Sequence, residues 1–125
     1  MDDWNDWDGV ELVIETIAED LPAKQALFAQ LDQRVPAHIP IGSNSSGFGI
    51  DEMTAGLATA DRMLNVHYSM PAHIVPMVEV ALGKNTHPPL AEAVCRLITA
   101  TGKKTTLIRQ YIPGLLIARL QHALM

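Results

Sequence analysis

The sequence lacks the features that define several classes of protein. Its single cysteine excludes an intrachain disulfide and a metal cage built on several cysteines. No apolar run approaches the roughly 18 residues of a membrane-spanning helix. With 14 acidic and 9 basic residues, the formal net charge is −5, which argues against nucleic acid or an anionic membrane surface as a partner.

Length and composition suit a small globular unit. At 125 residues the chain is one domain or a piece of a larger one. A hydrophobic content of 48% with 18% charged residues is typical of globular chains. The first eight residues are acidic and lack the basic and apolar parts of a signal peptide, so we expect a cytoplasmic location.

Common nucleotide-binding and catalytic motifs are missing as well. Gly47-Phe48-Gly49 is the only G-x-G, and a glutamate stands where the dinucleotide fingerprint needs its third glycine. No P-loop is present. The G-x-S-x-G nucleophile elbow fails at Ser45, because Ser43 occupies the position of its first glycine. A hydrolase triad of Ser46, His67 and an aspartate stays open as an alternative.

The metal-ligating residue types show no metal-binding pattern. His67, His73 and His87 do not have the spacing of zinc ligands, so we expect no metal site. Cys95 falls on the apolar face of an expected helix, where a free cysteine behaves as a small core residue.

The apolar periodicity predicts strands that alternate with helices. Strands are expected at residues 10–15, 38–42, 63–66, 77–82 and 105–108, and helices at 21–35, 50–57, 88–101 and 115–125. This alternation indicates an α/β fold with a largely parallel sheet. Because the chain starts just before a strand and stops within a helical pattern, we expect both ends to be cut from a larger fold.

A polar loop follows the second expected strand. Residues 43–49 combine hydroxyls, an amide and two glycines, and they lead into the next helix. In a parallel sheet, a loop at the carboxyl end of a strand is where ligands bind. An ordinary polar turn is the alternative interpretation.

The strongest chemical signal is a histidine and a glutamate in two neighbouring apolar runs. His67 ends the first run, and Glu79 lies inside the second, 12 positions later. If the runs are adjacent strands, the carboxylate can accept a hydrogen bond from one ring nitrogen and leave the other as a proton acceptor. A structural ion pair is the alternative.

These segments together resemble the 3-hydroxyacyl-CoA dehydrogenase family, the NAD-dependent enzymes of fatty-acid β-oxidation. Residues 43–46 are similar to the family's Ser-Asn-Thr-Ser loop, and residues 67–80 to its His-Phe-Phe-Asn-Pro…Val-Glu-Val signature. Further similar segments are residues 12–15, 19–32, Gly102-Lys103, and Pro113-Gly114 with Arg119.

The resemblance implies a partial Rossmann-type fold. Residues 1–110 would be the C-terminal half of the NAD-binding domain, and residues 111–125 would begin an all-α C-terminal domain. NAD is the implied cofactor and an acyl-CoA the implied substrate, and a full-length form is expected to be a homodimer.

The resemblance also implies roles for individual residues. His67 would be the general base, Glu79 would orient it, and Ser46 would hydrogen-bond the substrate oxygen. The positions that would line the NAD site are Glu19, Lys24, Asn44 and Ser46.

Two substrate-contacting positions depart from the family pattern. Met70 replaces an asparagine three places after the histidine, and Ala118 replaces a second asparagine before Arg119. A thioether cannot supply the donor and acceptor pair of an amide, and a methyl group supplies neither. These departures leave open a related dehydrogenase that acts on a small 3-hydroxy acid without CoA.

The sequence also lacks the Gly-rich half of the nucleotide fold and nearly all of the helical domain. We therefore expect the isolated chain to have negligible turnover. A truncated, non-catalytic piece that assembles with another polypeptide is the alternative to an enzyme.

Overall fold

The computed structural model describes residues 7–45, 47–68 and 77–108. The elements in chain order are β1 (Val13–Glu15), α1 (Leu21–Arg34), β2 (Ile41–Ser43), α2 (Ile50–Met53), the 3₁₀ helix η1 (Ala60–Arg62), β3 (Met63–Tyr68), β4 (Met77–Leu82), α3 (Pro88–Thr99) and β5 (Lys104–Ile108). The expected helix at 115–125 lies outside the described residues, as does the proposed boundary between two domains.

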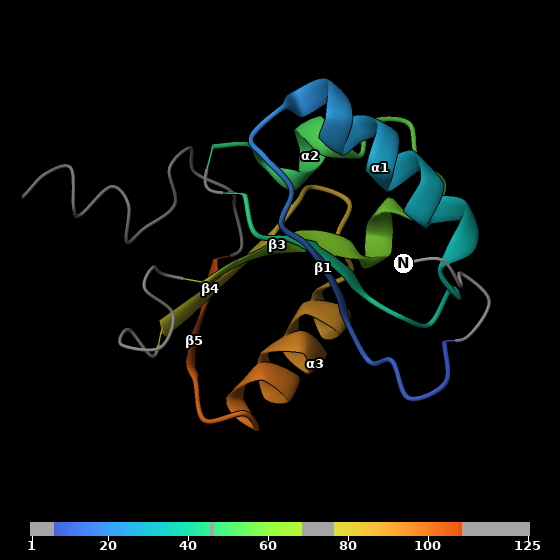
Figure 1. Ribbon diagram of the computed structural model, residues 1–125. Coiled ribbons are helices and arrows are strands. Elements are labelled where there is room, and N and C mark those ends of the chain that lie inside the picture. The colour runs from blue at the N-terminus through green and yellow to red at the C-terminus, as the bar shows by residue number, and fades with distance from the viewer. Residues whose placement is uncertain (1–6, 46, 69–76, 109–125) are drawn as a thin grey trace, which may run out of the picture.

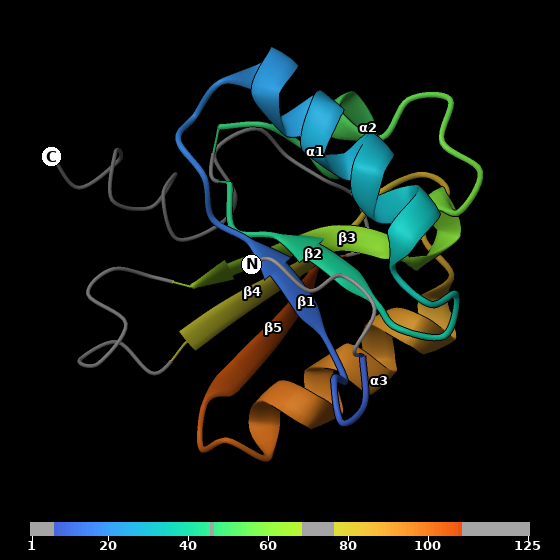
Figure 2. The same cartoon turned by 45° about the vertical axis from the view of Figure 1, so that its right-hand side comes forward.

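The five strands form one sheet whose spatial order is the chain order, β1-β2-β3-β4-β5 (Figure 2). β1, β2 and β3 run parallel, β4 is antiparallel to β3, and β5 is parallel to β4. The expected α/β fold with a largely parallel, Rossmann-type sheet is therefore confirmed. The connection from β3 to β4 reverses the chain, which brings the two apolar runs into direct contact.

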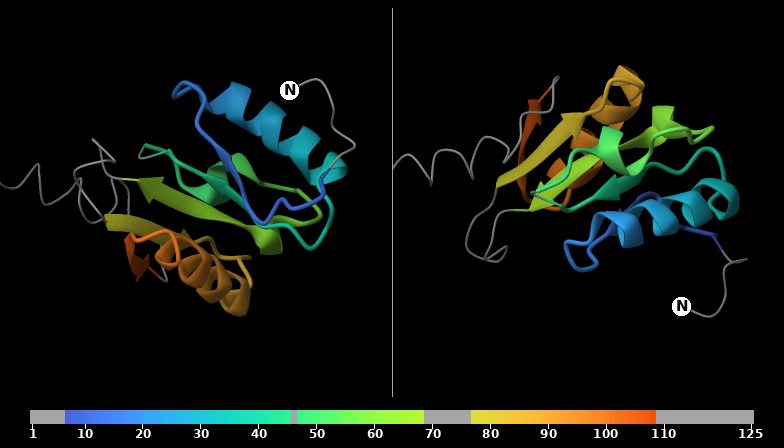
Figure 3. Two further views of the ribbon diagram at one scale, coloured as in Figure 1. Left: turned by 60° about the horizontal axis from the view of Figure 1, so that its bottom comes forward. Right: turned by 90° about the horizontal axis from the view of Figure 1, so that it is seen from above.

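Helices cover both faces of this sheet. α1 and α2 lie on one face over β1, β2 and β3, and α3 lies on the other face (Figures 1 and 3). One group of buried residues, which includes Phe28, Ile41 and Met63, fills the layer under α1 and α2. A second group, which includes Val66 and Val80, packs under α3. The alternation of strand residues thus assigns Met63, Asn65 and His67 to the α1 face.

Several observed elements are shorter than expected, most of all β1, β2 and α2. β1 begins at Val13 rather than at residue 10, and β2 begins only after Pro40, which has no N–H to give to a sheet. The expected helix at 50–57 stops at Met53, because the Thr54 N–H closes its last turn on Ile50 O and Gly56 then takes a left-handed φ of 80°. β3, by contrast, extends to Tyr68, so His67 lies within the strand.

Cys95 lies at the edge of the α3 core rather than inside it. It is partly buried and packs against the residues under α3, so the prediction of a core position holds only in part. Burial raises the pKa of its thiol, against the opposing effect of a hydrogen bond with Thr105. Among the described residues, no helix is long and apolar enough to cross a membrane.

A buried arginine fastens the carboxyl end of α1 to the segment before β2. Arg62 is 3% exposed, and its two terminal nitrogens donate to the backbone oxygens of Asp32, Val35, Pro36 and Ile39. Its Nε donates to the Thr59 hydroxyl at 3.0 Å. Burial lowers the pKa of Arg62, but a guanidinium stays charged in proteins.

Asp32 completes this cluster from α1. Its Oδ1 accepts a hydrogen bond from the Thr59 N–H at 2.9 Å and another from the Thr59 hydroxyl. Burial by itself would raise the pKa of Asp32, but these hydrogen bonds outweigh it and hold the pKa below its ordinary value.

The lowered pKa makes Asp32 a source of stability that acid removes. A carboxyl whose pKa is lower in the folded than in the unfolded state stabilises the fold above the unfolded pKa and loses that contribution as the pH falls through the folded pKa. We expect Asp32→Asn to reduce the free energy of unfolding at pH 7, with a loss that starts to shrink below about pH 5 and disappears once the pH is below the folded pKa. Urea titrations of both proteins across this range test it. A difference that stays constant down to pH 3 would contradict this assignment.

Candidate active site

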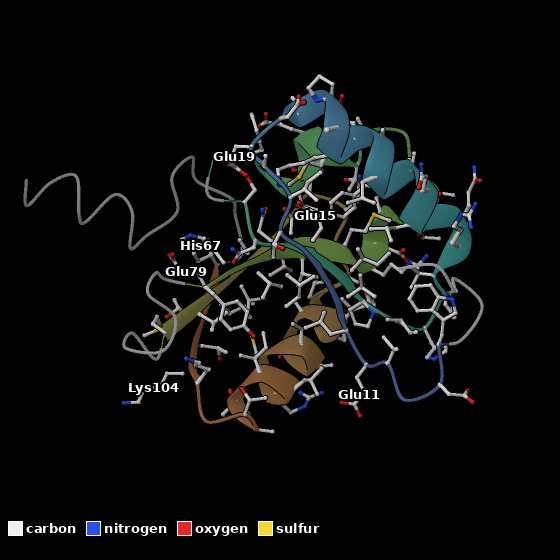
Figure 4. The ribbon with its side chains drawn as sticks, in the orientation of Figure 1. Glu11, Glu15, Glu19, His67, Glu79 and Lys104 are labelled. Carbon is white, nitrogen blue, oxygen red and sulfur yellow. The ribbon has the colours of Figure 1, made fainter. Side chains whose placement is uncertain are left out.

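His67 and Glu79 meet across the β3–β4 pair. They stand directly opposite one another in the antiparallel register, and His67 Nδ1 lies 3.2 Å from Glu79 Oε1. The Glu79 side chain is 0% exposed, whereas 13% of the His67 side chain reaches the surface. Figure 4 labels both side chains on the sheet. The contact between imidazole and carboxylate that their spacing allows is therefore present, and its His67 end is partly exposed.

This geometry selects one form of the imidazole. For Glu79 to accept a hydrogen bond, Nδ1 of His67 must carry the proton, and Nε2 of a neutral ring then keeps its lone pair. A carboxylate held in a fixed, dry position also stabilises the imidazolium that forms when Nε2 takes a proton. The pair thus has the arrangement that a general base with an orienting carboxylate requires.

A row of buried polar residues lies beside the pair on the α1 face. Glu15, Ser43 and Asn65 are in register on the three parallel strands, and each is at most 4% exposed. His67 follows Asn65 by two positions and so faces the same way. All of these side chains lie toward the carboxyl ends of β1, β2 and β3, the edge at which parallel sheets bind ligands.

Asn65 shapes the entry into α2. Its Oδ1 accepts the Ile50 N–H at 2.7 Å, and its Nδ2 donates to Phe48 O at 3.1 Å. Both ends of the Asn65 carboxamide are thus used to fix the end of the 43–49 loop. Asn44, at the start of the same loop, accepts the Tyr68 N–H on its Oδ1 at 2.8 Å.

Lys24 lies beneath this edge, between two carboxylates. Its side chain is 1% exposed, and its Nζ lies 2.6 Å from Glu15 Oε2 and 3.4 Å from Glu19 Oε1. Nζ also donates to Ile17 O at 3.0 Å. The Glu19 side chain, in contrast, is 47% exposed.

Some of the expected site residues cannot be placed. Ser46, Met70 and Ala118 lie outside the described residues, and their roles stay predictions. Of the others, the structure brings His67 and Glu79 together (Figure 4). It places Glu19, Lys24 and Asn44 around the loops after β1 and β2. Within the part of the chain that the structure describes, no cluster of three or more possible metal ligands occurs.

Three site residues were missed by the sequence analysis. Glu15 was expected only to mark the end of a strand, and Ser43 and Asn65 were read as part of a polar loop and of an apolar run. The sequence did contain a signal for them. Each of the three polar residues directly follows two strand residues that are apolar or glycine. Such an exception to a buried strand pattern indicates a buried polar group that needs a partner.

The comparison with protein families is consistent with this geometry. Residues 1–111 match the model of the 3-hydroxyacyl-CoA dehydrogenase NAD-binding domain. The chain belongs to the 3-hydroxyacyl-CoA dehydrogenase family. The family of NAD-dependent dehydrogenases expected from the motifs is thereby confirmed, and the matched domain identifies NAD as its nucleotide.

Relatives of this family member differ in the substrates for which they are named. The 5-formyl-3-hydroxy-2-methylpyridine 4-carboxylate 5-dehydrogenase of Mesorhizobium japonicum is 30% identical over 117 residues, which are 94% of this chain and 38% of the relative. The L-carnitine dehydrogenase of Streptomyces griseus is 32% identical over 114 residues, 91% of this chain and 34% of the relative. The chain thus spans little more than a third of the length of either relative.

A solved structure of a CoA-dependent member is equally similar. The 3-hydroxybutyryl-CoA dehydrogenase of Escherichia coli superimposes with a TM-score of 0.82 at 31% identity, covering 89% of this chain and 23% of that structure. Sequence identity to this chain therefore does not separate the CoA-dependent member from the other two relatives.

The residues present fit one part of a dinucleotide. The half-exposed Glu19 carboxylate accepts hydrogen bonds from hydroxyl groups, which a nucleoside has and a phosphate at neutral pH largely lacks. The Lys24 ammonium beside it is already held by two carboxylates and a carbonyl. The glycine-rich turn that cradles the pyrophosphate in such folds is not in this sequence.

Proposed function

We propose that this chain supplies the proton-transfer half of an NAD-dependent dehydrogenase that oxidises the C3 hydroxyl of an (S)-3-hydroxyacyl-CoA, as in fatty-acid β-oxidation. The observation that carries the proposal is the dry Glu79 carboxylate against Nδ1 of a partly exposed His67. The family match supports the same reaction class.

In the proposed reaction, the C3–H bond and the O–H bond of the substrate break to give a ketone. NAD, when bound, accepts the hydride. His67 takes the hydroxyl proton on Nε2, and Glu79 stabilises the resulting imidazolium. Ser46 hydrogen-bonds the substrate oxygen, while Met70 and Ala118 occupy substrate-contacting positions.

The nucleotide side of the site is proposed to comprise Glu19, Lys24, Asn44 and Ser46. Glu19 and Asn44 carry polar atoms at the ends of β1 and β2, where a nucleoside can reach them. Residues 1–110 would form the C-terminal half of the nucleotide domain, and residues 111–125 would begin the helical domain. The proposal also includes that a full-length form of the protein assembles as a homodimer.

A small 3-hydroxy acid without CoA is the second candidate substrate. Two relatives that match more than nine-tenths of this chain are named for L-carnitine and for a pyridine carboxylate rather than for a CoA ester. The loss of both family asparagines, at Met70 and Ala118, favours a substrate that is held differently from an acyl-CoA.

A chimeric enzyme tests this function. The chain would replace its matching segment in the Mesorhizobium relative, and NADH formation would be followed at 340 nm with 3-hydroxybutyryl-CoA, free 3-hydroxybutyrate and L-carnitine. We expect turnover of at least one 3-hydroxy compound by the chimera and negligible turnover by the 125-residue chain alone. A chimera that folds and binds NADH but oxidises none of them would refute the proposal.

A further inference from the structure

A buried carboxylate and a buried ammonium lie beneath the site, and neither takes part in the proposed proton transfer. Glu15 and Lys24 are 4% and 1% exposed, and their charged atoms are 2.6 Å apart. Burying two charges costs several kcal/mol in desolvation, and an apolar pair of similar volume is often as stable or more so. A contribution to the stability of the fold therefore does not by itself explain why this charged pair is buried.

The Glu15 carboxylate joins four separate parts of the chain. Its Oε2 accepts from Lys24 Nζ on α1 and from the Ile17 N–H at 2.8 Å in the loop after β1. Its Oε1 accepts from the Ser43 hydroxyl at the end of β2. One side chain thus ties together β1, the loop that follows it, α1 and β2.

Lys24 and Ser43 extend this connection into the 43–49 loop. The Ser43 hydroxyl accepts the Ser45 N–H at 3.2 Å. Glu19, which pairs with Lys24, accepts the Ser45 hydroxyl at 2.8 Å and the Gly47 N–H at 3.2 Å. The two loops at the carboxyl ends of β1 and β2 are therefore cross-linked by Glu15 and Glu19, and Lys24 pairs with both of these carboxylates.

The network ends next to the catalytic pair. Asn44 lies between Ser43 and Ser45, so the bonds on either side of it fix its position. Its Oδ1 accepts the N–H of Tyr68, the residue that follows His67 on β3. Loss of order in the loop would release this last bond and with it the outer end of β3.

We infer that Glu15 and Lys24 are positioning residues, which lock the loops after β1 and β2 together and through Asn44 fix the end of β3 at His67. Lys24 then acts on the site through Glu19 and the loop. The inference rests on the proposed function only in treating these loops as part of an active site.

Amide hydrogen exchange of the 125-residue chain tests this inference without nucleotide or substrate. The variant is Glu15→Leu/Lys24→Met, which removes both charges together and leaves neither one buried without its partner. We expect the Ile17, Gly47 and Tyr68 amides to exchange at least about tenfold faster, while Val66 and Val80, in the core ladder, change less than about threefold. Gln30→Ala, at an exposed residue on the same helix α1, is the matched control and should leave all five amides unchanged.

Either of two results would overturn the inference. Loop amides that stay within about threefold of the parent show that the pair does not order the loops. Loop and core amides that accelerate together show a role in global stability only. If the double variant does not fold, Ser43→Ala decides: the inference requires about tenfold faster exchange at Ser45 with an unchanged core. Because no step uses NAD, a failed oxidation assay and a failed exchange experiment remain separate outcomes.

Discussion

Replacement of His67 by glutamine is expected to lower the rate of hydride transfer in the chimeric enzyme by about 10²- to 10⁴-fold, the range for loss of a general base. Glutamine keeps a hydrogen-bonding side chain of similar length but cannot accept the hydroxyl proton. Steady-state kcat with the best substrate of the panel measures the effect. NADH affinity should change little, because His67 is assigned to the substrate side of the site.

Two further variants show whether the loss of kcat arises from the His67–Glu79 pair. Glu79→Gln should reduce kcat by a smaller factor, because the ring keeps its base but loses the charge that stabilises the imidazolium. His87→Gln, at an exposed histidine before α3, should have no effect. A His67→Gln chimera with nearly full activity would show that His67 does not transfer the proton.

Replacement of Arg62 by methionine is expected to cost about 3–5 kcal/mol of folding free energy. Arg62 donates five hydrogen bonds, four of them to backbone oxygens at the end of α1 and before β2. Without the guanidinium these oxygens lose their partner in a buried place. Because small domains have only about 5–15 kcal/mol of stability, the loss removes a large part of it. Urea unfolding followed by circular dichroism measures it.

Arg62→Lys should recover little of this stability, because a single ammonium cannot reproduce the planar fork of donors. Arg96→Met, at an exposed arginine on α3, is the matched control and should change the unfolding free energy by less than about 0.5 kcal/mol. Comparable losses in Arg62→Met and Arg96→Met would show that the observed hydrogen bonds do not account for the stability of this end of α1.

The fold was largely predictable because local signals agree with it. Pro22 begins α1 and the Pro88-Pro89 pair begins α3, while Gly102, with a φ of 94°, follows α3 before β5. The alternation of strands and helices then favours a parallel sheet. The boundaries were less accurate around Pro40, where the missing N–H and the bonds to Arg62 delay the start of β2.

The site was predictable only where two residues carry a characteristic spacing. His67 and Glu79 were found because 12 positions separate them in two apolar runs. Glu15 and Lys24 were not found as a pair. A charged residue near the end of a strand and another on a helix are both common, and in most proteins both are exposed. The Glu15 carboxylate also accepts a hydrogen bond from Ser43, which lies 28 positions away along the chain.

The sequence by itself determined the family, the order of strands and helices and the identity of the general-base candidate, because motifs and periodicity are local properties of a chain. Only the tertiary structure decided the antiparallel β3–β4 register that joins His67 to Glu79, and the network that encloses Lys24. Both depend on which side of a sheet a residue faces and on partners distant in sequence. A shift of one residue in strand register would turn the side chains of His67 and Glu79, or those of Glu15 and Ser43, to the opposite face of the sheet.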